Sequence, residues 1–149
     1  MQNGTDSTST TIKDDIFGFK AILTQSDTEI KLVKSRAILL MHSSGLNAEN
    51  WVTNRAASDT LPFLIADLGY DVWLGNNRGV NDYSKHETLT EDDAQYWDYT
   101  FADMGKFDVS AMINFITLKT GLSKISYMGF ERGNQQMFYA LAYNEEYLA

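Results

Sequence analysis

A continuous apolar run is the feature that most limits the folds open to this 149-residue chain. It reads Ala37-Ile38-Leu39-Leu40-Met41, five positions without a polar side chain. A strand with one solvent-exposed face alternates apolar and polar residues, whereas a strand that is buried on both faces is apolar throughout. The run therefore predicts a strand of a parallel sheet.

Predicted helices and strands alternate after this run. Residues 59–68 are predicted to be a helix, because Pro62 is tolerated in a first helical turn and Gly69 can end the helix. Residues 70–74 are predicted to be the next strand, and residues 80–99 a long loop. Three consecutive polar residues can cap the start of the helix, namely Ser58, Asp59 and Thr60.

A longer helix is predicted to start at Thr100, which can form a weak capping box with Asp103. Gly121 follows its expected end. An apolar stripe runs along this helix and is expected to face the core rather than a ligand. The stripe consists of Phe101, Met104, Phe107, Met112, Phe115 and Ile116.

Two further elements complete the pattern. The segment from Lys124 to Met128 is predicted to be a short strand, and the segment from Asn134 to Tyr143 a helix. Strands that alternate with helices are typical of an α/β fold with a largely parallel sheet.

The amino-terminal part has a different character. Residues 1–15 are polar and rich in Ser and Thr, and we expect a flexible tail. Residues 16–23 and 29–33 resemble two strands of a hairpin around a turn at residues 25–28. We therefore expect one partial domain over residues 16–149.

Composition excludes several classes of protein. The chain is 44% hydrophobic and carries a net charge of −8, which suits a folded core and argues against binding to nucleic acid or an anionic membrane. It has no cysteine and no apolar stretch near the ~20 residues of a membrane helix. We expect no metal, no cofactor and no transmembrane segment. We also expect an intracellular location, in an organelle or a cytoskeletal assembly.

The five-residue turn Gly129-Phe130-Glu131-Arg132-Gly133 lies between the last predicted strand and helix. Its outer glycines match the G-x-S-x-G nucleophile elbow, a sharp turn that projects a serine oxygen above a sheet. Its central residue is Glu131 instead of serine. The turn thus has the glycines of an elbow without the usual nucleophile.

Several segments, taken in their order and spacing, resemble the acid lipases of the α/β-hydrolase superfamily, the gastric and lysosomal group. These segments are residues 71–79, 83–86, 97–99, 101–108 and 119–121. The resemblance covers roughly residues 16–149. It implies the amino-terminal part of an α/β-hydrolase fold, with a hairpin and a largely parallel sheet flanked by helices, but without the later strands and the lid. By analogy with the family alone, the location would be lysosomal or secreted.

The chain departs from the family at the positions that carry the chemistry. The family has serine where this chain has Glu131, and histidine and glutamine in place of Phe130 and Arg132. Its oxyanion loop usually reads His-Gly followed by two apolar residues, whereas this chain has His42-Ser43-Ser44-Gly45. The catalytic acid and histidine of the family have no counterpart here. We therefore expect no catalytic residue in the degenerate elbow or oxyanion loop.

These departures favour a non-catalytic lipase-like pseudoenzyme that serves as a structural or interaction subunit. The strand from Lys124 to Met128 would have an open edge, and we expect a protein partner to cover it. Bound lipid is conceivable by resemblance alone. The alternative is half of a split lipid ester hydrolase, completed by a partner chain, and a truncated product without a role is a third hypothesis.

Individual residues allow competing interpretations. Glu131 could be a nucleophile with His42 as its base, but we expect a carboxylate that is solvated or paired locally with Arg132. His86 is expected to hold its loop by hydrogen bonds. Asn77 and Arg78 could bind an anion but are expected to shape a loop. The acidic run at residues 91–93 lacks the spacing of a calcium loop and is expected to be a solvated face.

Overall fold

The computed structural model describes residues 36–53, 56–80 and 85–144. The predicted tail and hairpin lie outside these residues. The described residues belong to one compact unit that spans Ser35–Ala149. No helix among them is both long and apolar enough to cross a bilayer.

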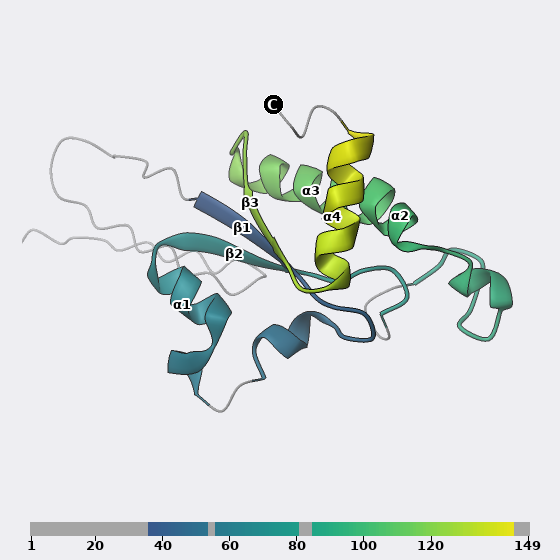
Figure 1. The fold of residues 1–149 in the computed structure, drawn as a ribbon, viewed down its shortest axis with the longest axis horizontal. Helices are drawn as coiled ribbons and strands as arrows, with labels where there is room; N and C mark the ends of the chain where they lie inside the picture. The colour runs from purple at the N-terminus through teal and green to yellow at the C-terminus, as the bar shows by residue number, and fades with distance from the viewer. Residues whose placement is uncertain (1–35, 54–55, 81–84, 145–149) are drawn as a thin grey trace, which may run out of the picture. The chain divides into compact units, whose positions relative to one another are not determined.

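A three-stranded parallel sheet forms the centre of this unit (Figure 1). Strand β1 (Arg36–Met41) lies between β2 (Tyr70–Gly75) and β3 (Ser126–Gly129). Both of its pairings are parallel, and Leu39 is opposite Trp73 on one side and Tyr127 on the other. The continuous apolar run is therefore the buried middle strand, as predicted.

Side chains of β1 point alternately to two apolar layers. Ala37, Leu39 and Met41 pack with Ile116 on one face of the sheet, while Ile38 and Leu40 pack with Ile65 on the other. Ile65 belongs to α1 (Leu61–Asp67), and Ile116 belongs to α3 (Ser110–Thr120). Helices thus cover both faces of the sheet, which gives the predicted α/β architecture.

Helix α1 is shorter than the predicted helix and begins differently. A 3₁₀ turn, η2 (Ala57–Asp59), precedes it, and Thr60 is its N-cap residue. The Thr60 side chain makes no cap hydrogen bond, because its hydroxyl donates to the carbonyl of Ala56 at 2.8 Å. The prediction of a side-chain cap was wrong, since a nearby carbonyl binds the hydroxyl instead.

The long helix begins as predicted but changes type. Thr100 and Asp103 form the capping box at α2 (Phe101–Asp103), with the Asp103 carboxylate accepting from the Thr100 N–H at 2.9 Å. A π-helical segment, η4 (Met104–Val109), then joins α2 to α3. Gly121 follows α3 with φ of 70°, as expected of a helix-ending glycine.

The π-helical segment changes which side chains of the predicted stripe are buried. Met104 and Ile116 are buried, but Phe107 and Phe115, which lie within and after this segment, are each more than 40% exposed; Phe101, which precedes it, is exposed as well. A π-helical segment inserts extra residues into the turn and so rotates the following positions about the helix axis. A single straight stripe could not anticipate this rotation.

The remaining elements lie around the carboxyl ends of the strands. They are the 3₁₀ turns η1 (Ala48–Trp51) and η3 (Ala94–Trp97) and helix α4 (Arg132–Tyr143). Turn η3 lies in the region predicted as a plain loop. Helix α4 starts two residues before its predicted start, within the five-residue elbow, and packs against β3 and η4.

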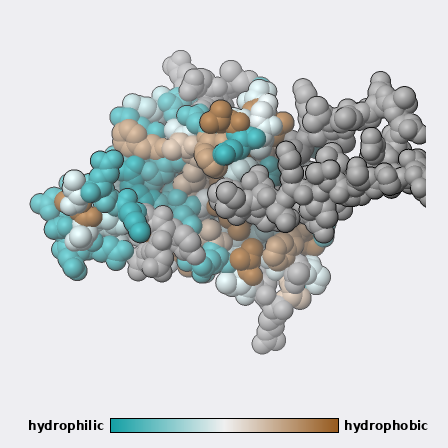
Figure 2. Space-filling view, turned by 180° about the vertical axis from the view of Figure 1, so that it is seen from behind, coloured by the Kyte–Doolittle hydropathy of each residue, from teal (hydrophilic) through white to brown (hydrophobic). Residues whose placement is uncertain are grey.

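Apolar side chains remain exposed on several elements. Figure 2, which views the molecule from behind, shows brown apolar patches separated by hydrophilic residues. Near the β3 edge and the elbow, Met128 and Phe130 are 37% and 57% exposed, and Phe138 of α4 is 71% exposed. Within the described residues β3 pairs with β1 alone.

Candidate functional site

The turn between β3 and α4 has the backbone of an elbow. Glu131 lies at its apex with φ of 49° and ψ of −103°. It is the one non-glycine residue with positive φ among the residues that the structure describes. A residue with a side chain adopts such a conformation only where the surrounding structure enforces it. The strained position is therefore the one that the motif assigns to a nucleophile.

The two outer glycines are required by close backbone contacts. A Cβ at Gly129 would lie 2.5 Å from the carbonyl carbon of Gly133, and a Cβ at Gly133 would lie 2.7 Å from the carbonyl oxygen of Met41. Both distances are too short for a side chain. The glycines thus allow α4 to begin directly against the end of β1.

Tyr127 of β3 also supports the elbow. Its hydroxyl donates to the carbonyl of Gly133 at 2.6 Å and accepts from the fully buried Gln136 amide at 3.4 Å. Burial raises the pKa of Tyr127 to about 12. The neutral hydroxyl therefore stays protonated and holds the first turn of α4.

The Glu131 carboxylate contacts the loop after β1. Its Oε2 accepts from the Ser43 hydroxyl at 2.5 Å and from the Ser44 backbone N–H at 3.0 Å. The hydrogen bond from Ser43, followed by those from the backbone N–H groups of Ser44 and Arg132, lowers the pKa of Glu131 to about 2. Donors to the charged form stabilise a carboxylate in this way. We refer to these contacts as the elbow clamp.

This arrangement differs from the expected environment of Glu131. The carboxylate was expected to be solvated or paired with the neighbouring Arg132, and it is indeed exposed and interacts with Arg132, but neither is its principal contact. Its side-chain partner is instead Ser43, 88 positions away in sequence. Arg132 contributes chiefly its backbone N–H, and its Nε is buried without a hydrogen-bond partner. Sequence reasoning missed this contact because only the register of β1 against β3 brings the two loops together.

His42 is placed among backbone groups rather than at the carboxylate. It is 4% exposed, and its Nδ1 lies 2.7 Å from the Ser43 carbonyl oxygen, while its Nε2 lies 3.2 Å from the Asn77 backbone nitrogen. A carbonyl can only accept and an N–H can only donate. The ring is therefore the neutral form with its proton on Nδ1, and both nitrogens are engaged.

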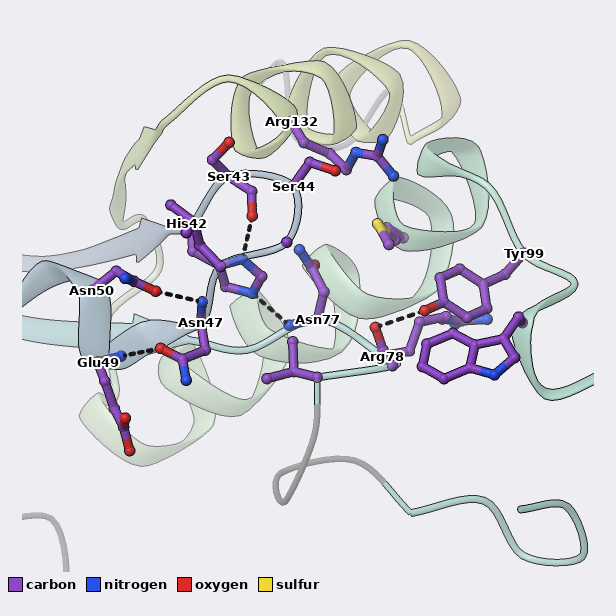
Figure 3. Close-up of a pocket in the computed structure, with 16 residues that line it drawn as sticks. His42, Ser43, Ser44, Asn47, Glu49, Asn50, Asn77, Arg78, Tyr99 and Arg132 are labelled. Atoms are coloured by element: carbon purple, nitrogen blue, oxygen red, sulfur yellow. Dashed lines mark hydrogen bonds between the residues drawn. The ribbon is translucent and has the colours of Figure 1, made fainter. Parts of the chain in front are cut away.

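A pocket of about 570 Å³ lies beside the elbow, at the carboxyl ends of β1 and β2 (Figure 3). Ligand sites of open α/β sheets occur at this end of the strands. Its wall includes Ser43, Ser44, Asn77 and Arg132. Asn77 is 3% exposed and its Oδ1 has no hydrogen-bond partner. The pocket thus contains polar groups that an additional ligand could satisfy.

Arg78 and Asp108 join the loop after β2 to the π-helical segment. The Arg78 Nε and Nη2 donate to Asp108 Oδ1 at 2.9 and 2.6 Å, and the Arg78 backbone N–H donates to Asp108 Oδ2 at 3.1 Å. The hydrogen bond to Asp108 raises the pKa of Arg78, although burial opposes it. We call this contact the Arg78–Asp108 junction. Arg78 therefore shapes the loop, as expected, and is not a free anion ligand.

Asp108 was not singled out from the sequence. It stands in one of the segments that carry the resemblance to acid lipases, as Arg78 does in another. The presence of both residues in these segments was the sequence signal available for predicting their contact. The pairing itself depends on the three-dimensional path of the chain, because the two residues are 30 positions apart.

The other candidates hold local turns. His86 Nδ1 accepts from the backbone N–H groups of Thr88 and Leu89 at 3.1 and 3.0 Å, which is the loop-holding role expected of it. Asp93 accepts from the Thr90 N–H at 2.8 Å. Among residues 36–53, 56–80 and 85–144, no three His, Cys, Asp or Glu side chains are grouped to hold a metal.

Comparison with known proteins identifies relatives. No family model matches the sequence. Lipase member M of Mus musculus is 39% identical over 119 residues, which is 79% of this chain and 28% of the relative. Gastric triacylglycerol lipase of Rattus norvegicus is 40% identical over 111 residues. The lysosomal acid lipase/cholesteryl ester hydrolase of Homo sapiens is 40% identical over 105 residues.

The chain spans about a quarter of the length of these relatives, 28% of the rat lipase and 26% of the human one. The described part of the chain forms a parallel sheet with helices on both faces. Fold and sequence similarity thus agree. The chain belongs to the acid-lipase-like family of the α/β-hydrolases and corresponds to part of that fold.

Proposed function

We propose that this chain is a non-catalytic, lipase-like protein that acts as a structural or interaction subunit of a larger assembly. The observation that supports the proposal is the elbow clamp. Glu131 stands at the strained apex where the motif has serine, and its carboxylate is already bound to Ser43 and Ser44.

Acyl transfer at an elbow needs a nucleophile, a base and donors for the developing oxyanion. The Glu131 oxygen nearest the loop accepts two hydrogen bonds, which lowers its nucleophilicity. The Ser44 and Arg132 N–H groups already interact with this carboxylate. His42 has both ring nitrogens engaged with the backbone. These engaged groups support the proposal that the residues near the elbow do not catalyse acyl transfer.

An ester hydrolysis assay tests the absence of catalysis. Purified protein, alone and in the complex isolated from its source, is expected to release no p-nitrophenol from p-nitrophenyl butyrate above a heat-inactivated control. Glu131→Ser is the matched variant, because it restores the residue of the motif at the same backbone position. Turnover by the natural complex that disappears in Glu131→Ala would favour the alternative, a lipid ester hydrolase completed by a partner chain.

The interaction role is supported by the edge of β3. Its pairing with β1 leaves the other edge open within the described residues, and exposed apolar side chains occur on β3 (Met128), directly after it (Phe130) and on α4 (Phe138). An open strand edge with apolar neighbours favours association. We propose that a protein partner covers this edge.

Light scattering during size-exclusion chromatography tests the partner. The chain alone is expected to self-associate, and Phe130→Asp and Phe138→Asp are expected to reduce association. Leu118→Asp is the matched control, because Leu118 is 81% exposed on α3, an element outside the proposed contact. A folded monomer with a cooperative melting transition would contradict the proposed dependence on a partner.

A further inference from the structure

We propose that the pocket beside the elbow binds a small uncharged carboxamide between the side chains of Asn77 and Arg132. The Asn77 Oδ1 can only accept a hydrogen bond, and the Arg132 Nε–H can only donate one. Neither atom takes part in the elbow clamp. The inference goes beyond the proposed function, because it concerns binding and holds whether or not the chain is catalytic.

Both atoms are buried and have no hydrogen-bond partner among the described residues. Asn77 as a whole is 3% exposed. Nearly all buried polar atoms of folded proteins are satisfied by another protein group or by a bound molecule. The pair therefore fits a molecule that donates to Asn77 and accepts from Arg132.

The Arg132 side chain is a feature of this chain rather than of its family. The acid lipases have glutamine at this position of the elbow, as noted from the sequence. The elbow motif itself specifies the two glycines and the central nucleophile, and it leaves the side chain at residue 132 open. The proposed site therefore does not follow from family membership.

The neighbouring asparagine shows how an acceptor in this loop can be satisfied by the protein. The Asn76 Oδ1 accepts from the Ala48 backbone N–H at 2.8 Å. The Asn77 backbone N–H donates to His42 Nε2 at 3.2 Å, and this contact fixes the position of the residue. Asn77 is thus held through its backbone, while its side-chain acceptor stays available to a ligand.

The pocket has room for such a molecule. Its volume of about 570 Å³ lies in the range of sites that hold small organic ligands. Asn77 from the loop after β2 and Arg132 from α4 both line it, and Figure 3 shows Arg132 above Asn77. Trp97 and Met104 contribute apolar parts of the wall. A ligand can therefore place a polar end between Asn77 and Arg132 and a short apolar chain against this wall.

The polar groups favour an uncharged end on the ligand. A primary carboxamide carries a carbonyl oxygen and an N–H on the same carbon, so it can meet a donor and an acceptor together. A carboxylate has acceptors alone, and one of them would face the Asn77 Oδ1. The positive charge of Arg132 already interacts with the Glu131 carboxylate. We therefore expect a carboxamide to bind more tightly than the carboxylate of the same chain length.

Three ligands of equal chain length test the inference on the wild-type chain by NMR. Hexanamide, N,N-dimethylhexanamide and sodium hexanoate are titrated separately at pH 6, with the Arg132 Nε–H and Trp97 indole signals followed. Hexanamide is expected to shift both signals saturably. The dimethyl compound cannot donate to Asn77, and hexanoate brings two acceptors, so each is expected to bind about tenfold more weakly.

Two substitutions remove the polar atoms one at a time. Arg132→Met removes the donor and Asn77→Leu removes the acceptor, and each is expected to weaken hexanamide about tenfold, the loss of one buried hydrogen bond. Lys119→Met is the matched control, because it removes a cation from α3, which does not contribute to the described wall of the pocket. It should leave the affinity for hexanamide unchanged.

The inference would be overturned if hexanamide gave no saturable shift in the wild-type chain, or if hexanamide and hexanoate bound equally well. Hexanamide binding that Arg132→Met leaves unchanged would also contradict the site. If Asn77→Leu does not fold, the ligand series still tests the acceptor, because the dimethyl compound lacks the N–H. Equal affinities for hexanamide and its dimethyl derivative would contradict a hydrogen bond to Asn77.

Discussion

Asp108 and Glu131 are two carboxylates that tie loops at the carboxyl ends of the strands to neighbouring helices, but they do so in different surroundings. The Asp108 side chain is 12% exposed, and both of its oxygens accept hydrogen bonds from the guanidinium of Arg78. Glu131 is exposed and binds only uncharged donors, from a strained backbone position. One contact is a charged pair within the scaffold, and the other occupies the site where the family places its nucleophile.

This difference separates a contact that stabilises the fold, the Arg78–Asp108 junction, from a contact at the position of the nucleophile, the elbow clamp. Loss of one member of a partly buried ion pair leaves the other charge without compensation. Loss of an exposed carboxylate leaves donors that water can satisfy. We therefore expect the Arg78–Asp108 junction to govern stability and the elbow clamp to govern the local electrostatics of the elbow.

The largest effect is expected for Asp108→Ala. This change leaves the Arg78 guanidinium and backbone N–H without their acceptor, and we expect a loss of about 2–3 kcal/mol in the free energy of unfolding. Urea denaturation followed by circular dichroism measures it. Asp108→Asn is the matched control, because it keeps an acceptor and should be intermediate. Glu131→Ala should be less destabilising than Asp108→Ala, and the reverse order would contradict the comparison.

A smaller effect is expected for Tyr127→Phe. Loss of the hydroxyl removes the acceptor of the buried Gln136 amide and the donor to the Gly133 carbonyl, at an expected cost of about 1–2 kcal/mol. The same denaturation experiment measures it. Tyr70→Phe on β2 is a suitable control for a tyrosine on another strand. Equal stabilities of Tyr127→Phe and the wild type would show that the hydroxyl does not support the elbow.

The smallest effect is a change in the pH dependence of stability. The folded-state pKa of Glu131 is lowered from 4.5 to about 2, so its contribution is present above about pH 4.5 and is lost as the pH falls toward 2. Glu131→Gln lacks this titration. The melting temperature should therefore decline less steeply with acid in Glu131→Gln than in the wild type.

The pKa values of Asp93 and Asp103 are also lowered, by hydrogen bonds from Thr90 and Thr100, and their titration occurs in both chains. The difference between the two melting curves thus isolates Glu131. Parallel curves between pH 5 and pH 2 would mean that the elbow clamp does not couple to folding.

Local patterns predicted much of the fold. The apolar run gave β1, the Thr100 and Asp103 pair marked a helix start, and Gly121 marked a helix end. Each of these signals lies within a few residues of the feature that it predicts. The change of helix type at η4 was not predicted, because it depends on how that segment packs against α4.

The site was predictable only in its position. The glycines located the elbow, and Glu131 was recognised as the unusual residue within it. Its binding to Ser43 and the pairing of Arg78 with Asp108 were not predicted. These contacts join residues that are far apart in sequence, and they are set by the sheet register and by the path of the loops.

The elbow clamp is tested most directly by following the titration of the Glu131 carboxyl carbon by NMR. We expect a midpoint near pH 2 in the wild type and a midpoint closer to the ordinary value of 4.5 in Ser43→Ala, because the Ser43 hydroxyl is the principal donor. A wild-type midpoint near 4.5 that Ser43→Ala does not change would contradict the elbow clamp.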